Sequence, residues 1–201
     1  DIQNKIIISA DQKIKYENLI TTIPLIEFLK LINNRNHFNN MISKLDYISV
    51  FNINYGIETS VNNQAHWIYF PEKKYDFYRA GFYHNFSEFS VPSKNHHSSY
   101  LEISYKGSSK KKQNKDFLKE IKKQFFEIGI YSENNSKICQ QFLLDIKYAY
   151  VIFDRYRKEA IEYLTPIYKK NSIIPVGRYA EWDYSSMQDS IKSAHNAVSK
   201  L

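Results

Sequence analysis

The chain has 201 residues, a formal charge of +7, and 43% hydrophobic and 16% aromatic content. This composition excludes overall disorder, and the length allows one good core with at most a second small lobe. The single cysteine, Cys139, excludes a disulfide framework and fits a reducing cytoplasm, and no apolar run approaches the ~20 residues of a membrane-spanning helix.

Two short strands are predicted at the start of the chain, Lys5 to Ser9 and Lys13 to Glu17, with a polar turn between them. The segment Leu19 to Leu25 follows, and its Pro24 suits the first turn of a helix. The apolar face predicted for that helix consists of Leu25, Phe28, Leu29 and Ile32.

The middle of the chain is predicted to contain consecutive strands without helices between them, which indicates a largely antiparallel sheet. Gly81 lies in one of these strands and marks either a bulge or a point of close approach. The last strand alternates as a half-buried strand does, with Leu101, Ile103 and Tyr105 on one face and Glu102 and Ser104 on the other. The predicted strands are Leu45 to Ile57, Ala65 to Phe70, Phe77 to Tyr83 and Ser99 to Lys106.

The second half of the chain begins with a lysine-rich run, Gly107 to Lys115. We interpret this run as a solvated loop, because it lacks the interleaved aromatic residues of a nucleic-acid site. Helices are predicted from Asp116, as the capping residue, to Ile128 and from Tyr156 to Lys169. Between the helices, a mixed segment begins at Cys139, and Lys147 to Asp154 is predicted to be a strand.

The chain ends with an apolar run, Ile173 to Val176, followed by Gly177, an aromatic loop and an Ala-rich helical tail from Ile191 to Leu201. A helix start presents N–H groups and positive dipole to an anion or to a polar ligand edge. Gly177 allows close approach of the backbone, and Asp189 and Ser190 are the predicted caps of the helix. These residues alone predict a ligand loop at a strand–helix junction.

The pattern Gly177-Arg178-Tyr179-x-x-Trp182-x-Tyr184-x-x-Met187-x-Asp189-Ser190-Ile191 resembles the C-terminal flavin-contacting segment of FAD-dependent amine oxidase and protoporphyrinogen oxidase-like proteins. It is also similar to a segment of UDP-galactopyranose mutases, although Ser186 stands where that segment has Asp. Thr21 to Leu25 resembles the crossover by which the chain leaves the FAD domain in the same family, and Tyr69 to Glu72 begins a stretch that resembles the substrate-domain core. The alternative interpretation is a Tyr- and Trp-rich structural loop before a surface helix.

The resemblance implies an FAD contact in which the flavin carries the redox chemistry, so no side-chain nucleophile is expected and no catalytic residue is assigned. Arg178 would polarise the flavin edge or bind an anionic substrate group, or else form a salt bridge to Glu181. Trp182 and Tyr184 would line the pocket or pack in the core. The implied cofactor-binding residues are Gly177, Arg178, Tyr179, Trp182, Tyr184, Met187, Asp189 and Ser190.

Three further residues are candidates for substrate binding: Arg79, Tyr83 and His84. They lie on or beside a predicted sheet face that would roof a substrate site, and a structural role is the alternative for each. His96 and His97 are adjacent and would point apart in an extended segment, so no metal site is predicted.

The five glycines are too far apart to form the Gly-x-Gly-x-x-Gly fingerprint of a dinucleotide cradle. The chain also opens with Asp1 instead of Met and shows no signal peptide. With the resemblance, these observations imply the C-terminal portion of a larger flavoprotein. The parent would bind FAD, whereas this fragment would bind little or none and would be inactive without the missing N-terminal FAD-binding region, its expected partner.

We therefore predict an α+β fold, with a mostly antiparallel substrate domain and helices plus remnants of an FAD-binding α/β lobe. The predicted domains are 1–24, partial FAD-lobe strands; 25–170, the substrate (cap) domain; and 171–201, the FAD-contacting strand, loop and helix. The predicted function is a fragment of an FAD-dependent oxidoreductase that acts on a small molecule, with no nucleic-acid partner. Two alternatives are a sugar-nucleotide enzyme similar to UDP-galactopyranose mutase and a non-catalytic basic binding module.

Overall fold

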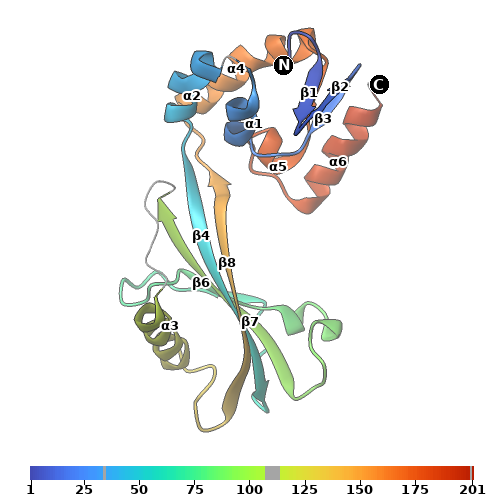
Figure 1. Ribbon diagram of the computed structural model, residues 1–201. Coiled ribbons are helices and arrows are strands. Elements are labelled where there is room, and N and C mark those ends of the chain that lie inside the picture. The colour runs from blue at the N-terminus through green and yellow to red at the C-terminus, as the bar shows by residue number, and fades with distance from the viewer. Residues whose placement is uncertain (34, 107–113, 200) are drawn as a thin grey trace. The chain divides into compact units, whose positions relative to one another are not determined.

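Two compact units make up the chain (Figure 1). The terminal unit is built from both ends of the chain, Asp1–Tyr47 and Tyr150–Leu201, and the middle unit is the continuous stretch Ile48–Ala149. The computed structural model describes all residues except 34, 107–113 and 200. Most of the lysine-rich run therefore lies outside the described residues.

The units divide the chain at other places than the predicted boundaries after residues 24 and 170. Helices α1 (Leu25–Leu31), α2 (Asn39–Lys44) and α4 (Arg155–Lys170) belong to the terminal unit, where α4 contacts both β9 (Ile173–Pro175) and α2. The assignment of the terminal segments to an FAD lobe stays a prediction.

The terminal unit combines short strands with helices. Its first two strands form the predicted antiparallel hairpin, in which Ile6 pairs with Lys15 and Ser9 with Gln12. Helix α1 begins directly after Pro24, as predicted. No helix within the described part of the chain combines the length and apolar character needed to cross a membrane. The elements are β1 (Ile6–Ser9), β2 (Gln12–Lys15), β3 (Leu19–Thr21), α1 (Leu25–Leu31), α2 (Asn39–Lys44), α4 (Arg155–Lys170), β9 (Ile173–Pro175), α5 (Gly177–Ala180) and α6 (Met187–Val198).

A two-stranded parallel sheet joins the two ends of the chain. Strand β3 pairs with β9 in a register that runs from Leu19↔Ile173 to Thr21↔Pro175. Parallel strands usually belong to larger sheets that are covered on both faces. Ile20, in the centre of β3, is nevertheless 41% exposed. The pair is therefore a parallel sheet with part of its apolar surface uncovered.

The core of the terminal unit is formed mainly by α1, α4 and the segment after β9. Phe28 of α1 and Tyr168 of α4 meet edge to face, with ring centroids 5.9 Å apart. Trp182 is fully buried and lies edge to face with Tyr47 at 6.2 Å. Aromatic pairs of this geometry add about 0.5–1.5 kcal/mol beyond the area that they bury.

The middle unit is built on an antiparallel sheet. Among its described residues, five strands form one sheet in the order β5-β6-β7-β4-β8. The pairs β5–β6, β6–β7 and β4–β7 are antiparallel, which confirms the prediction for this region and the α+β class. The elements are β4 (Tyr47–Thr59), β5 (Trp67–Tyr69), β6 (Arg79–Phe82), β7 (His96–Lys106), α3 (Lys115–Glu127) and β8 (Ser136–Val151).

Helix α3 packs against the sheet of the middle unit (Figure 1). Its Ile121 and Phe125 are fully buried, and Phe125 lies 5.0 Å from the ring of Tyr55 on β4. Leu101 and Ile103 of β7 join the same core, as the alternation in the sequence predicted. One apolar cluster therefore holds the helix on the sheet.

Two predicted features of the middle unit are wrong in detail. Asn114, and not Asp116, caps α3, because its side-chain oxygen accepts a hydrogen bond of 2.9 Å from the N–H of Phe117. The mixed segment that was predicted to begin at Cys139 belongs to the single long strand β8, because pairing with β4 keeps it extended.

Candidate functional site

The candidate cofactor segment begins where β9 ends. Gly177 has a φ of +80°, a left-handed conformation that favours glycine, and it opens the short helix α5. Its N–H donates a hydrogen bond of 3.2 Å to the hydroxyl of Ser193 on α6. The stretch predicted as an aromatic loop is thus partly helical, and its start is bonded to the helix that follows.

Trp182 fixes the middle of this segment from inside the terminal unit. Its side chain is fully buried and its φ is +52°, which is unusual for a bulky residue. Its carbonyl oxygen accepts a hydrogen bond of 2.7 Å from Nε of Arg157 on α4, and Nη2 of Arg157 lies 3.2 Å from the carboxylate of Asp183. The indole packs in the core, which is the second of the two predicted alternatives for Trp182.

Arg178 lies with two tyrosine rings at the surface of the terminal unit. Its guanidinium is 4.7 Å from the ring centroid of Tyr184 and 5.3 Å from that of Tyr150, and the two rings stack at 5.9 Å. Nη1 of Arg178 donates a hydrogen bond of 3.0 Å to the carbonyl of Ser185. Tyr184 remains 63% exposed. This Arg178–tyrosine cluster (Arg178, Tyr150 and Tyr184) presents a cation and an open aromatic ring to a ligand.

The start of α6 is closed by its own side chains. Ser186 is the N-cap: its hydroxyl accepts a hydrogen bond of 3.2 Å from the N–H of Asp189, and the Asp189 carboxylate accepts one of 2.9 Å from the N–H of Ser186. The predicted caps, Asp189 and Ser190, are therefore corrected to Ser186, with Asp189 as the third residue of a capping box. The hydrogen bonds from Ser186 lower the pKa of Asp189.

The remaining predicted cofactor residues lie near the surface of the same segment. Met187 is 87% exposed at the start of α6, and Tyr179 is 38% exposed on α5. The hydroxyl of Ser190 donates a hydrogen bond to the carbonyl of Ser186 at 3.1 Å. Glu181, the predicted salt-bridge partner of Arg178, accepts a hydrogen bond of 2.9 Å from Ser193.

The linear motif does not contain two residues that shape this segment, Arg157 and Tyr150. Arg157 comes from α4 and Tyr150 from the end of β8, so both reach the segment only through the tertiary fold. No local pattern marks them in the sequence. The structure identifies Arg157 by its hydrogen bond to Trp182 and Tyr150 by its contact with Arg178.

In the middle unit, Arg79 is held in an ion pair on one face of the sheet. Its Nη2 lies 2.7 Å from each carboxylate oxygen of Glu102, and its Nη1 donates a hydrogen bond of 3.1 Å to the hydroxyl of Tyr69. Tyr78 also donates a hydrogen bond to Glu102. The guanidinium and the carboxylate fix one another in place, as bidentate pairs do.

Tyr83 lies near this ion pair. Burial, and then the negative charge of Glu102, raises the pKa of Tyr83. Its ring lies 4.7 Å from that of Tyr100, which covers Gly81 so closely that an added Cβ would be 2.0 Å from Cζ. This confirms the predicted close approach at Gly81. Arg79 and Tyr83 therefore occur together, with Tyr100 beside them.

His84 belongs to a different group of side chains. Its ring stacks on His97 with centroids 3.8 Å apart, and Nδ1 of His97 lies 3.0 Å from the hydroxyl of Tyr131. Burial lowers the pKa of His97 to about 4 and also lowers that of His84. His96 instead bonds with Ser93 at 2.8 Å, so the two adjacent histidines point apart, as predicted.

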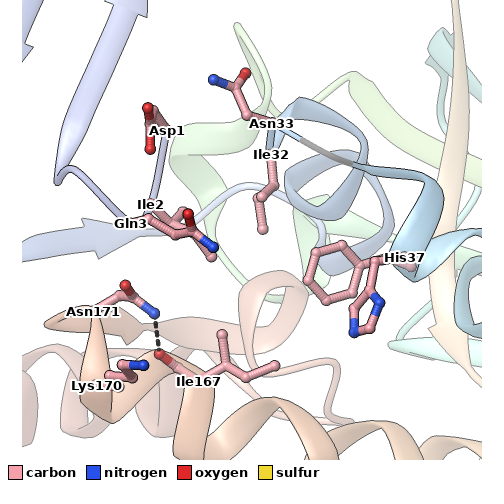
Figure 2. Close-up of a pocket in the computed structure, with 10 residues that line it drawn as sticks. Asp1, Ile2, Gln3, Ile32, Asn33, His37, Ile167, Lys170 and Asn171 are labelled. Carbon is pink, nitrogen blue, oxygen red and sulfur yellow. Dashed lines mark hydrogen bonds between the residues drawn. The ribbon is translucent and has the colours of Figure 1, made fainter.

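The terminal unit also contains a cavity of about 930 Å³. In Figure 2, Ile32 and Ile167 approach the cavity from opposite sides, and the amide of Asn171 donates a hydrogen bond of 2.7 Å to the carbonyl of Ile167. None of the predicted site residues lines this cavity. Its described lining consists of Asp1, Ile2, Gln3, Ile32, Asn33, His37, Phe38, Ile167, Lys170 and Asn171.

The chain is similar to known proteins in its three-dimensional structure. No family model and no curated protein sequence matches it. A crystal structure of reduced UDP-galactopyranose mutase matches with a TM-score of 0.77 and 25% identity over 91% of this chain. The resemblance read from the sequence is confirmed. A putative protoporphyrinogen oxidase from Exiguobacterium sp. 255-15 matches with a TM-score of 0.71 and 10% identity over 97% of this chain.

A third structure, an oxidoreductase from Methanosarcina mazei, shares the fold with a TM-score of 0.54 and 8% identity over 98% of this chain. The chain covers 40% of the mutase chain, 43% of the putative oxidase and 48% of the Methanosarcina protein. It thus spans less than half the length of each of these three structures.

Proposed function

We propose that this chain supplies the substrate domain and the C-terminal flavin-contacting segment of an FAD-dependent oxidoreductase. The observation that carries the proposal is the parallel β3–β9 pair followed at once by Gly177, the Arg178–tyrosine cluster and α6. In an α/β nucleotide-binding sheet, ligands bind beyond the carboxyl ends of parallel strands. The likeness to the mutase and oxidase structures supports a flavoprotein family.

The partner in this proposal is an N-terminal FAD-binding region of the same protein. A parallel sheet of two strands leaves apolar surface that further strands and helices would cover. Ile8 and Ile14 of the hairpin are 53% and 49% exposed, and Ile191 of α6 is 70% exposed. The chain by itself would therefore be inactive and bind FAD weakly or not at all.

The residues of the segment fit a flavin. Arg178 would face the polar edge of the ring system and Tyr184 would stack beside it, since both lie at the surface and Tyr184 is 63% exposed. The exposed Met187 at the start of α6 would meet the cofactor, whereas the N–H groups of Ser186 and Asp189 are taken up by the capping box. When bound, the flavin supplies the electron transfer, and the protein residues orient it.

The second candidate function is sugar-nucleotide chemistry similar to that of UDP-galactopyranose mutase. The higher identity and TM-score of the mutase structure favour it over the oxidase. The Arg79–Glu102 pair, with Tyr69, Tyr78 and Tyr83 around it, supplies polar groups for a sugar on the sheet face. The mutase segment has Asp at the position of Ser186, and this difference argues against the mutase function.

The first experiment compares this chain with the protein expressed together with its upstream coding region. We expect the longer protein to purify with visible flavin absorbance and this chain to be colourless. In the longer protein, Arg178→Ala should lower the fraction of bound FAD, whereas Arg155→Ala, at an exposed position on α4, should leave it unchanged. A folded longer protein that takes up no FAD would contradict the proposal.

The second experiment separates the two reactions with the FAD-loaded longer protein. An oxidase would reduce its flavin with an amine or porphyrinogen substrate and reoxidise it with oxygen. A mutase would isomerise UDP-galactose with its flavin reduced and would consume no oxidant. Isomerisation without oxidant consumption would replace the oxidase proposal by the mutase one.

A further inference from the structure

Strand β8 forms an edge of the five-stranded sheet within the described residues. The sheet order places β4 on one side of β8 and no described strand on the other (Figure 1). The strand runs over 16 residues, from Ser136 to Val151. A long edge strand offers a row of N–H and C=O groups to another strand.

The centre of β8 lacks the features that usually protect an edge. Phe142, Leu143 and Leu144 are 64%, 37% and 45% exposed, so large apolar side chains lie on both faces of the strand. No proline interrupts it, and no charged residue occurs between Lys137 and Asp145. Natural edges are normally blunted by lysine, proline or a bulge in such positions.

We propose that β8 pairs with β8 of a second copy of this chain, antiparallel and centred on Gln141. A two-fold axis through this point places each residue opposite a partner on the same face of the sheet. Lys137 then faces Asp145 of the second copy, whose carboxylate also accepts a hydrogen bond from Tyr105 of its own copy, and the symmetry repeats this opposite-charge pair. Such cross-strand pairs stabilise a sheet.

The apolar residues also match in this register. Leu144 faces Ile138 of the second copy, and Cys139 faces Leu143. The two Phe142 side chains become diagonal neighbours, within reach of one another. Ile138 already packs against the core cluster of the middle unit, so its face would continue that core across the contact.

A register centred on Phe142 instead places Lys137 opposite Lys147 of the second copy. Like charges directly opposite one another destabilise a sheet. A register centred on Gln140 loses the pairing of Lys137 with Asp145 and puts Leu143 opposite Lys137. Charge complementarity therefore selects the register centred on Gln141.

The first test measures the mass of the purified chain by light scattering over a range of concentrations. We expect a concentration-dependent dimer. Lys137→Glu should weaken dimerisation several-fold, because two opposite-charge pairs become like-charge pairs, and Lys137→Glu with Asp145→Lys should restore it. A chain that stays monomeric at every concentration would overturn the proposal, and so would a dimer that Lys137→Glu leaves unchanged or that the double variant fails to restore.

The second test fixes the register by crosslinking in a Cys139→Ser background. Gln141→Cys should form a disulfide-linked dimer on mild oxidation, because the two cysteines face one another. Gln140→Cys is the matched control, since Gln140 is also exposed but faces Phe142 of the second copy. Efficient crosslinking of Gln140→Cys in place of Gln141→Cys would overturn the register. Circular dichroism of each variant will test whether it is folded.

Discussion

Nε of Arg157 donates a hydrogen bond of 2.7 Å to the carbonyl oxygen of Trp182. This contact ties α4 to the turn between α5 and α6, where Trp182 adopts a left-handed conformation with a φ of +52°. The same guanidinium lies 3.2 Å from Asp183 and 4.1 Å from the centroid of Phe153. One side chain thus holds a turn whose backbone is otherwise unfavourable.

Replacing this arginine tests how much the turn depends on it. We expect Arg157→Lys to lower the free energy of unfolding by about 1–3 kcal/mol, because a lysine cannot reproduce the planar fork that contacts both Trp182 and Asp183. Urea unfolding monitored by tryptophan fluorescence measures the change. Arg155→Lys, two residues earlier in α4 and exposed, is the control and should have little effect. Equal effects of the two substitutions would contradict this reading of the contact.

Gly81 should not tolerate a methyl group. A Cβ at this position would lie 2.0 Å from Cζ of Tyr100, so Gly81→Ala must displace the ring. We expect a loss of about 1–3 kcal/mol in unfolding free energy, as for other overpacked sites. Adding Tyr100→Ala should make the alanine at 81 much less costly, which a double-mutant cycle measures. Independent, additive effects would show that the ring does not cause the loss.

The stacked His84–His97 pair predicts that stability falls on acidification. Burial lowers the pKa of His97 to about 4 from its usual 6.5, and its close neighbours are His84 and the hydroxyl of Tyr131. Below pH 6.5 the unfolded chain binds protons that the folded chain excludes, so the free energy of unfolding decreases until about pH 4.

We expect this decrease to amount to roughly 1–3 kcal/mol between pH 7 and pH 4. Chemical unfolding at a series of pH values measures it. His97→Gln should flatten the profile, whereas His195→Gln, at an exposed position on α6, should leave its shape unchanged. A profile of the same slope in His97→Gln would refute the assignment.

Helix α6 should depend on its capping box. Ser186→Ala removes the hydroxyl that accepts the hydrogen bond from the N–H of Asp189, and we expect a loss of about 0.5–2 kcal/mol. Thermal unfolding followed by circular dichroism measures the loss. Ser199→Ala, at the other end of the same helix, is the control. If both variants melt alike, the box contributes nothing measurable.

Local signals in the sequence sufficed for elements that depend on neighbours along the chain. Pro24 predicted the start of α1, and the alternation that places Leu101 and Ile103 on one face predicted β7. Glu102 was predicted on the polar face, and its 9% exposure follows from the ion pair with Arg79, which only the folded sheet creates. The polar face was predictable from the sequence, but its buried ion pair was not.

The candidate site shows the same division. The pattern from Gly177 to Ile191 located the segment in the sequence. The true cap was also predictable, because Ser186-x-x-Asp189 has the spacing of a capping box with Ser186 as the N-cap. Arg157 and Tyr150 carry no such mark, because they reach Trp182 and Arg178 through the packing of α4 and β8. Contacts of this kind require the tertiary structure.

The register that joins Leu19 to Ile173 has a consequence for the order of folding. The terminal unit needs residues from both ends of this chain, so its parallel strands cannot meet until Ile173–Pro175 has left the ribosome. The middle unit is continuous and can collapse earlier, which shortens the effective loop that β3 and β9 must close. We therefore expect the middle unit to gain hydrogen-exchange protection first during refolding and the β3–β9 amides to be protected last.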